Sequence, residues 1–316
     1  MRIFCCILCL AAVILTACEK EELPVVYKAD GSLSIDNVEM GETYETQLFY
    51  SLVKQEVVAS NSRFNHDFRL IHVGDTTLIR LNSAKYMRAY PLFGSFEESY
   101  IPDENKFEVD RVATFFDSTV IDLDLSKLYM VDMGKSATGS ALGFYKVEFQ
   151  EVTDGFNVKF SLPDATFGSD LLVLHNESAG IQDFSILEQK SLENVPIKED
   201  WDIKFTQYTD ILEGHTPYLV TGVLLNPFGV EVANVTGQKF EELDLNSVQL
   251  LNYTVNRDAI GYDWKSFDFG TSAYVLEEGN AYVLKCMDGK YRYLSFVGFY
   301  NELGEKGTPS FEIRAF

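Results

Sequence analysis

Basic residues are scarce in this chain: its 316 residues include 26 Lys and Arg against 48 Asp and Glu, a formal net charge of −22. Binding to nucleic-acid phosphates relies on Lys and Arg, so this balance argues against a nucleic-acid partner. It also argues against attachment to an anionic membrane surface by charge alone. Such an excess of one charge suits a soluble domain that is exposed to solvent.

Cysteine is scarce once the first residues are set aside. Four of the five cysteines lie within residues 1–18, so Cys286 alone is left in the rest of the chain. That part therefore has neither an intramolecular disulfide nor a thiolate metal cluster. Cys286 lies in a strand-like pattern, and we expect it to be a small buried hydrophobic side chain.

The motifs of several common enzyme classes are also missing. The sequence contains no Gly-x-Ser-x-Gly, no His-Glu-x-x-His and no glycine-rich phosphate loop. Acidic pairs such as Glu97-Glu98 and Glu277-Glu278 have the residue type of glycosidase carboxyls, but spatial separation decides that chemistry. In so acidic a chain we interpret them as solvated surface, and we predict a protein that is not an enzyme.

One long apolar run is present, and it begins the chain. Residues 3–14 follow Arg2 and are too few to span a bilayer permanently, which is typical of an export signal. Residues 15–18, Leu-Thr-Ala-Cys, match a lipobox and predict a signal peptide over 1–17 with lipid, palmitate included, on Cys18. The alternative is a cleaved signal without lipid. Cleavage leaves 25 basic against 48 acidic residues, a net charge of −23.

The residues after Cys18 suggest where the protein is held. Residues 20–22, Lys-Glu-Glu, resemble the surface-export signal of Bacteroidetes lipoproteins. Two or three acyl chains anchor a protein stably, whereas one does not. We expect residues 18–35 to be a lipidated tether, and the protein to be an outer-membrane lipoprotein exposed at the cell surface.

Period-two alternation of apolar and polar residues dominates the rest of the chain. In residues 144–149, Tyr145, Val147 and Phe149 share one face and Lys146 lies on the other, as in a half-buried antiparallel strand. Further strands are predicted at 156–160, 201–206, 280–285 and 291–296, with Asp-Gly turns at 154–155 and 288–289. Residues 241–248 are the clearest candidate for a short helix.

The strands and turns occur in two similar sets. Tyr50 and Asp67 in the first set correspond to Phe184 and Asp202 in the second, with offsets of 134 and 135 residues. Two landmarks with nearly the same offset favour an internal duplication. We predict a mainly β fold made of two antiparallel halves, residues 36–165 and 170–316, packed together and joined by a linker at 161–168.

The order of these segments resembles the HmuY family of Bacteroidetes haem-binding lipoproteins, in its longer, two-part form. The second half carries a Phe-Ser-Ile strand at 184–186, a Trp-Asp strand at 201–202 and the ending 300–307. The first half has Tyr-Ser-Leu at 50–52, with His66 in place of the Trp. The resemblance implies a β-rich protein that captures haem or a related tetrapyrrole for iron acquisition and passes it to a TonB-dependent receptor.

The resemblance also implies where haem would lie. Family members hold haem between two loops, commonly with two axial His ligands or with Met in place of His. The corresponding segments here are 267–272 and roughly 245–263, which contain Tyr253 and Tyr262 but no His or Met. Tyrosine can also hold haem iron, so haem stays compatible with these loops.

Four histidines occur in the whole chain, and His215 is our haem-ligand candidate because it alone lies on a clearly polar loop. His66, His72 and His175 stand in or beside apolar strands, which favours structural roles. The soft ligands among the apolar residues are predicted to pack in the core; they are Met87, Met130 and Met133.

Three functions are compatible with these observations. The first is non-enzymatic haem or tetrapyrrole binding for uptake, with the membrane reached through the lipid anchor only. The second is an HmuY-like lipoprotein whose cleft serves another ligand or a protein partner, which the missing His and Met favour. The third, a carbohydrate-active enzyme, has only the acidic surface in its favour.

Overall fold

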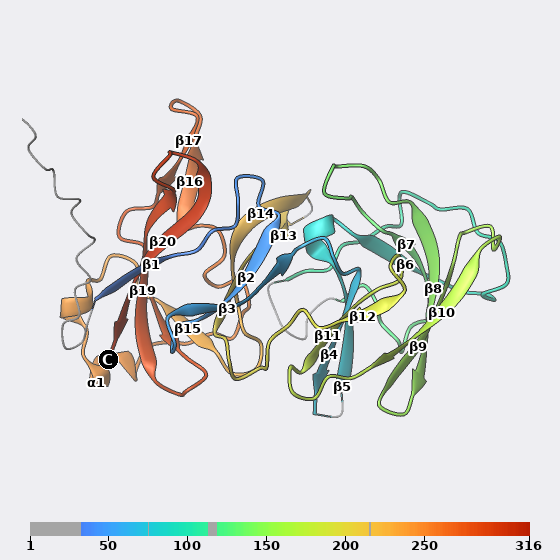
Figure 1. Cartoon of the computed structure of the whole chain (residues 1–316), viewed down its shortest axis with the longest axis horizontal. Coiled ribbons are helices and arrows are strands. Elements are labelled where there is room, and N and C mark those ends of the chain that lie inside the picture. Colours follow the sequence, from blue (N-terminus) through green and yellow to red (C-terminus); the bar gives the residue numbers. More distant parts are fainter. Residues whose placement is uncertain (1–32, 75, 113–118, 215) are drawn as a thin grey trace, which may run out of the picture.

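The structure is a computed structural model and describes residues 33–316 except 75, 113–118 and 215. The predicted signal peptide, Cys18 and His215 lie outside the described residues. The described chain is mainly β, as predicted, and forms two lobes side by side along the long axis (Figure 1). Within these described ranges, no helix is both long enough and apolar enough to cross a membrane.

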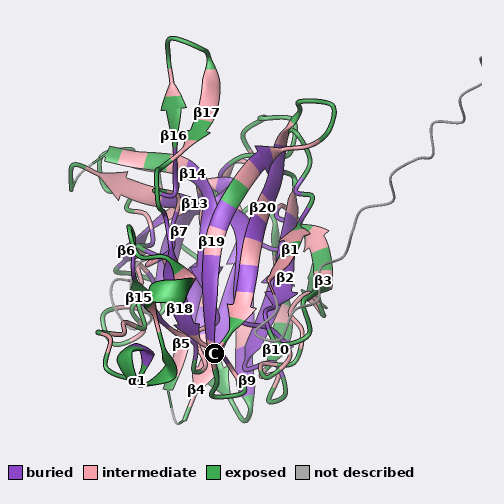
Figure 2. Ribbon diagram, turned by 90° about the vertical axis from the view of Figure 1, so that its left-hand side faces the viewer, coloured by how far each residue is buried: buried purple, intermediate pink, exposed green. Residues whose placement is uncertain are grey.

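The lobe at the left of Figure 1, here the first lobe, consists of β1–β3 and β13–β20. Its larger sheet has the antiparallel order β1 (Ser34–Asn37), β20 (Lys306–Ala315), β19 (Tyr291–Tyr300), β18 (Tyr282–Lys285) and β15 (Glu231–Asn234). Its smaller sheet has the order β14 (Thr216–Leu225), β13 (Ile203–Leu212), β2 (Thr46–Ser51) and β3 (Glu56–Ser62). A separate hairpin, β16 (Lys265–Asp268) and β17 (Ala273–Leu276), projects beyond the sheets (Figures 1 and 2).

The second lobe consists of β4–β12. Its larger sheet has the order β10 (Gly168–Leu174), β9 (Gly155–Ser161), β8 (Phe144–Val152), β7 (Leu128–Asp132) and β6 (Arg88–Leu92). Its smaller sheet has the order β12 (Lys190–Leu192), β11 (Ile181–Ser185), β4 (Phe68–Val73) and β5 (Thr76–Leu81). The described helices are short: 3₁₀ turns at Ser83–Lys85 and Phe240–Glu242, and α1 at Leu245–Val248 within the predicted helical segment.

Each lobe has its own hydrophobic core, formed where its two sheets face each other. In the first lobe Phe205 of β13 stacks on Phe311 of β20, with ring centroids 5.4 Å apart. In the second lobe Phe68 of β4 meets Phe149 of β8 edge to face at 5.7 Å. The strands of both sheets are accordingly buried along much of their length (Figure 2). The predicted core methionines and Cys286 are buried as well.

One strand departs from its predicted alternation. Val147 and Phe149 of β8 face the core as expected, but Lys146, assigned to the polar face, is fully buried. Its ammonium donates a 2.6 Å hydrogen bond to the Phe96 carbonyl and another to the Glu98 carbonyl, and the Phe96 ring lies 5.2 Å away. The expectation of a solvated lysine was wrong because the segment around residues 96–98 covers this face of the sheet.

The two lobes correspond strand by strand. An offset of about 134 residues relates β2–β5 to β11–β14, and it turns the sheet order β14-β13-β2-β3 into that of β5-β4-β11-β12. The same offset places β1 at β10, the edge strands of the two larger sheets. Each smaller sheet therefore contains two strands from before and two from after residue 165. Shared ancestry of the two sets stays a prediction, but their arrangement follows the predicted repeat.

The repeated aspartates act across this exchange. Asp202 lies beside β2, where its Oδ2 accepts a 2.7 Å hydrogen bond from the Leu52 amide. Asp67 lies beside β11, where its Oδ2 accepts bonds from Leu187 N at 3.1 Å and Ser185 Oγ at 2.6 Å. Each aspartate thus fixes the turn after a strand of the other sequence half, because a buried carboxylate needs such donors.

The predicted boundary between the halves lies within a single sheet. Residues 162–167 form the turn between β9 and β10, with Leu162 N donating to the Phe167 carbonyl at 3.0 Å. The division into 36–165 and 170–316 stays a prediction about the sequence repeat. The spatial units are the two lobes, each built from both sequence halves.

Candidate functional site

A cleft opens in the first lobe between β14 and the projecting β16–β17 hairpin. Its volume is about 440 Å³, within the range of roughly 300–1,000 Å³ that is typical of small-molecule sites. Residues from β13, β14, both hairpin strands and the loop before β16 line it. The site therefore depends on segments far apart in the sequence.

Tyrosine is the most frequent aromatic residue in the lining of this cleft. Tyr44, Tyr218, Tyr262 and Tyr274 contribute to the wall together with Phe267. Tyr218 of β14 is 58% exposed, so its phenol is open to a ligand. The Tyr262 hydroxyl instead donates to Asp210 Oδ2 at 3.1 Å, and burial together with this carboxylate raises the pKa of Tyr262 to about 12.

Lys265 is a buried cation in the same wall. Its Nζ donates to the Thr221 carbonyl at 2.6 Å and lies 4.5 Å from the Trp264 ring centroid and 5.4 Å from that of Tyr274. Burial lowers the pKa of Lys265 to about 7. An anionic ligand group in the cleft would favour the charged ammonium and could bind it directly.

The tip of the hairpin exposes further aromatic surface. Phe269 is 87% exposed, and the Phe267 ring meets the Phe269 and Tyr274 rings edge to face at 5.2 and 5.3 Å. Asp268 fixes the turn by accepting hydrogen bonds from Gly270 N and Thr271 Oγ1, both at 2.8 Å. Exposed aromatic rings beside a cleft are available for stacking on a flat ligand.

A smaller polar cavity of about 40 Å³ lies between the two smaller sheets. Its lining includes four basic side chains, Arg69, Arg80, Lys204 and Arg257, and the neutral imidazole of His66. Burial lowers the pKa of His66 to about 3, so this histidine is a buried structural residue, as we predicted. The cavity has room for about one small molecule such as water.

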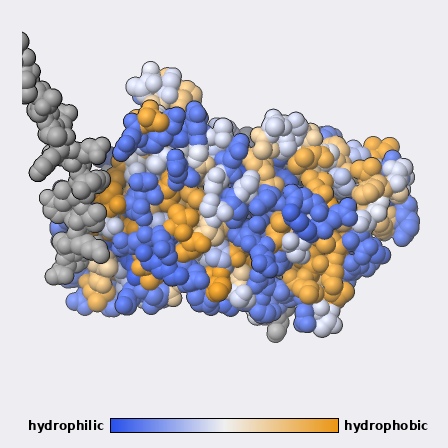
Figure 3. Space-filling model, in the orientation of Figure 1, coloured by the Kyte–Doolittle hydropathy of each residue, from blue (hydrophilic) through white to orange (hydrophobic). Residues whose placement is uncertain are grey.

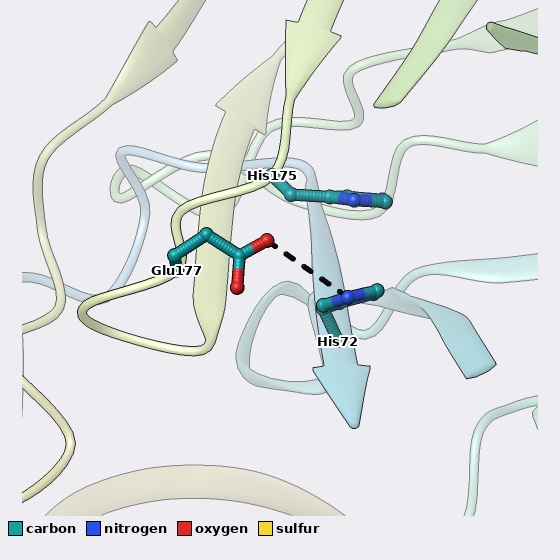
Figure 4. Close-up of side chains that lie close together, drawn as sticks. All are labelled: His72, His175 and Glu177. Atoms are coloured by element: carbon teal, nitrogen blue, oxygen red, sulfur yellow. Dashed lines mark ion pairs between the residues drawn. The ribbon is translucent and has the colours of Figure 1, made fainter. Parts of the chain in front are cut away.

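Two further histidines come together in the second lobe. His72 at the end of β4 and His175 after β10 stack with ring centroids 4.2 Å apart and 20° between their planes. Glu177 completes the group, its Oε1 lying 3.9 Å from His72 Nε2 (Figure 4). We predicted separate structural roles for these histidines, and no local pattern brings together positions so far apart in the sequence.

A family model described as HmuY protein matches residues 43–313. The chain belongs to the HmuY family. The match covers both lobes and so agrees with the resemblance seen in the order of the sequence motifs. A comparison with curated proteins gave no match.

Several solved structures are similar to this HmuY-family chain at low identity. PinO from Porphyromonas gingivitis, in its apo form, shares 11% identity over 90% of this chain and 97% of that one, with a TM-score of 0.36. The apo HmuY analog from Tannerella forsythia shares 9% identity over 90% and 95%, with a TM-score of 0.26. An HmuY-like heme-binding protein from Bacteroides vulgatus shares 16% identity over 54% and 91%, with a TM-score of 0.25.

The two loops that the HmuY resemblance assigned to the ligand have different positions. Residues 267–272 form the hairpin tip at the cleft, and Tyr262 lines the cleft as well. Tyr253 does not, because its hydroxyl donates to the Val248 carbonyl at 2.9 Å and its ring packs near Tyr291. Tyr44, Tyr218 and Tyr274 were missed by sequence reasoning, which had only the high tyrosine content to suggest them.

The acidic pairs are distributed over the surface. Glu97 and Glu98 are exposed in the second lobe, and Glu277 and Glu278 are exposed beside the hairpin of the first lobe. On the face in Figure 3, hydrophilic side chains alternate with small hydrophobic patches across both lobes. The two pairs therefore do not form a common site.

Proposed function

We propose that this HmuY-family protein binds haem or a related tetrapyrrole in the cleft between β14 and the β16–β17 hairpin, without catalysing a reaction on it. The observation that carries the proposal is the 440 Å³ cleft walled by four tyrosines and Phe267. Aromatic walls favour a flat aromatic macrocycle. Tyrosine oxygen is a known protein ligand of haem iron.

Tyr218 is the better candidate for an axial ligand. Its side chain is largely exposed in the cleft, whereas the Tyr262 hydroxyl is engaged by Asp210. The neighbouring carboxylate favours the neutral phenol of Tyr262 and opposes the phenolate that ferric iron prefers. Lys265 would pair with a propionate carboxylate of the macrocycle.

A haem titration followed by absorbance tests this proposal on the chain that begins after Cys18. We expect saturation near about one haem per chain with a shifted Soret band, since bound iron gains a protein ligand. Tyr218→Phe should lower the affinity at least about 10-fold and change the band, whereas Tyr262→Phe should have a smaller effect. A titration without a shifted band would contradict haem binding.

His215 provides a separate arm of the same experiment. It follows β13 and precedes β14, the strand that carries Tyr218, and it was the sequence-based ligand candidate. Loss of the shifted band in His215→Ala, with Tyr218→Phe unaffected, would transfer the axial role to the histidine. Unchanged binding in both variants would move it to another cleft tyrosine.

The proposal includes delivery as well as capture. A lipid on Cys18 would hold the protein at the outer membrane, exposed at the cell surface, and the bound tetrapyrrole would pass to a TonB-dependent receptor. Cys18→Ala should move the protein from the membrane fraction to the soluble fraction because no other anchor is proposed. Retention of the variant in membranes would contradict the lipid anchor.

A second candidate is an HmuY-family cleft that serves a different ligand. Of the described residues that line it, none is His or Met, while Asp263 and Glu277 add two carboxylates. Carboxylates beside aromatic rings also suit a cationic aromatic ligand. Tyrosine fluorescence quenched by such a ligand, with no response to haem, would favour this function.

A further inference from the structure

The cluster of His72, His175 and Glu177 has the composition of a metal site. The ligand atoms of these residues lie within 4.8 Å of one another. Two imidazoles and one carboxylate are common ligands of divalent transition metals, with a remaining coordination position for water or another ligand. Figure 4 shows the carboxylate of Glu177 pointing toward the imidazole of His72, with the His175 ring stacked alongside.

Thr77 orients both imidazoles from the opposite side. Its Oγ1 lies 3.0 Å from His72 Nδ1 and 3.2 Å from His175 Nε2. Thr77 is the direct cross-strand partner of His72 in the β4–β5 hairpin, which fixes this contact. When both rings donate their N–H to the threonine oxygen, the lone pairs of His72 Nε2 and His175 Nδ1 stay free. Histidines that bind metal are usually oriented by such a hydrogen bond to the other ring nitrogen.

The surroundings favour a cation in neutral solution. Burial and the neighbouring His72 lower the pKa of His175, so this imidazole has no proton to lose before it binds a metal. Glu151 and Asp154 act on His175 together with Glu177, which adds negative charge. Thr77 and Glu151 also line a solvent-filled hollow of about 620 Å³, through which an ion can reach the second lobe.

We propose that His72, His175 and Glu177 bind a divalent first-row transition metal ion, with Thr77 as the positioning residue. Tetrahedral zinc, with bonds of about 2.0–2.1 Å, places its ligand atoms about 3.3 Å apart. The 3.9 Å separation of His72 Nε2 and Glu177 Oε1 is close to this value, and Glu177 is exposed and free to move closer. A small rotation of one imidazole out of the stack completes the site.

The metal would link separate parts of the second lobe. His72 belongs to the smaller sheet, whereas His175 and Glu177 belong to the connection from β10 in the larger sheet to β11 in the smaller one. A bound ion therefore joins the end of β4 to this crossover. Because the ion binds the folded chain, it should raise thermal stability in proportion to the logarithm of its concentration above its Kd.

Calorimetric titration with zinc of the chain that begins after Cys18 tests the site. We expect about one zinc per chain, and at least about a 10-fold loss of affinity in His72→Ala, His175→Ala and Glu177→Gln. Thr77→Val should lower the affinity by roughly 10-fold without removing a ligand. Glu193→Gln, an exposed carboxylate in the same lobe, is the matched control and should bind zinc like the unchanged chain.

Cobalt(II) gives a spectroscopic test that does not depend on the heat of binding. Visible absorption bands of tetrahedral cobalt should appear with the unchanged chain and Glu193→Gln, and disappear with His72→Ala. Melting temperatures without metal identify any variant that is merely unfolded, and the zinc-dependent rise should vanish only in the ligand variants. Equal zinc affinity in folded His72→Ala and the unchanged chain, or no zinc binding, would overturn the proposal.

Discussion

Lys204 and Arg69 occupy corresponding positions in the two smaller sheets, yet their partners differ. Arg69 forms a bidentate pair with Asp183, its cross-strand neighbour, at 2.6 and 2.9 Å. The cross-strand neighbour of Lys204 is Phe49, whose ring centroid lies 5.7 Å from the ammonium. Burial accordingly lowers the pKa of Lys204 well below its usual value.

Replacing this lysine should stabilise the protein. Lys204→Met removes a buried amine that has no carboxylate partner, and we expect the free energy of unfolding to rise by about 1–3 kcal/mol. Asp183→Asn is the matched opposite: it leaves Arg69 unpaired and should lower the same free energy by about 3–5 kcal/mol. Urea denaturation of both variants measures these changes, and a Lys204→Met protein less stable than the unchanged chain would contradict the argument.

Lys265 should give stability a distinctive pH dependence. Its pKa is 10.5 in the unfolded chain and about 7 in the folded protein, so between these values the unfolded chain binds more protons. The contribution of this group to the free energy of unfolding therefore rises with pH across that window, by at most about 1.4 kcal/mol per unit. Lys265→Met should show a shallower rise in urea denaturation between pH 7 and 10. An identical slope in the variant would contradict the lowered pKa.

At the scale of elements, the β16–β17 hairpin is the part most clearly tied to the cleft. It forms a two-stranded sheet of its own, and such sheets are marginally stable without further packing. Tyr274 packs against Phe299 at 5.1 Å and fixes the base of the hairpin, while its tip is exposed. The hairpin thus contributes a wall of the cleft and little of the core.

Removing the hairpin should separate binding from folding. We expect replacement of residues 266–275 by an Asn-Gly turn to lower haem affinity at least about 10-fold, because one aromatic wall is lost. The melting temperature should fall by only a few degrees, since the core of the first lobe is kept. Shortening the exposed turn at 136–140 of the second lobe is the control. Full haem affinity after hairpin removal would place the site elsewhere.

Local elements were predictable from the sequence because their causes are local. Period-two alternation and the Asp-Gly turns predicted β8, β9, β18 and β19, and Gly289 adopts the positive φ of 74° that its turn requires. The burial of Lys146 was not predictable, since it depends on a segment some fifty residues away. Tyr262 could be named from the family resemblance, whereas Tyr44 and Tyr218 join the cleft only through tertiary packing.

At the scale of the whole molecule, the two sequence halves exchange strands. Sequence alone suggested two halves packed together, but β13 pairs with β2 and β11 pairs with β4. The repeat was visible as an offset between motifs, while the partner of each strand was not, because either half offers the same motifs. Asp67 and Asp202 show the consequence, since each accepts hydrogen bonds from the other half.

Neither half should fold alone. Residues 19–165 and 170–316 expressed separately would each lack two strands of both smaller sheets, exposing edges and core. We expect little cooperative unfolding from either piece, and recovery of a single β-rich complex when the two are co-expressed. Circular dichroism and size-exclusion chromatography measure this. Two independently folded monomeric pieces would contradict the strand exchange.

Locating haem iron by anomalous X-ray diffraction from crystals grown with haem tests the central claim most directly. The account predicts an iron peak in the cleft, within bonding distance of Tyr218 and beside the β16–β17 hairpin. An iron peak between His72 and His175, or in another part of the molecule with the cleft empty, would contradict haem capture at this site.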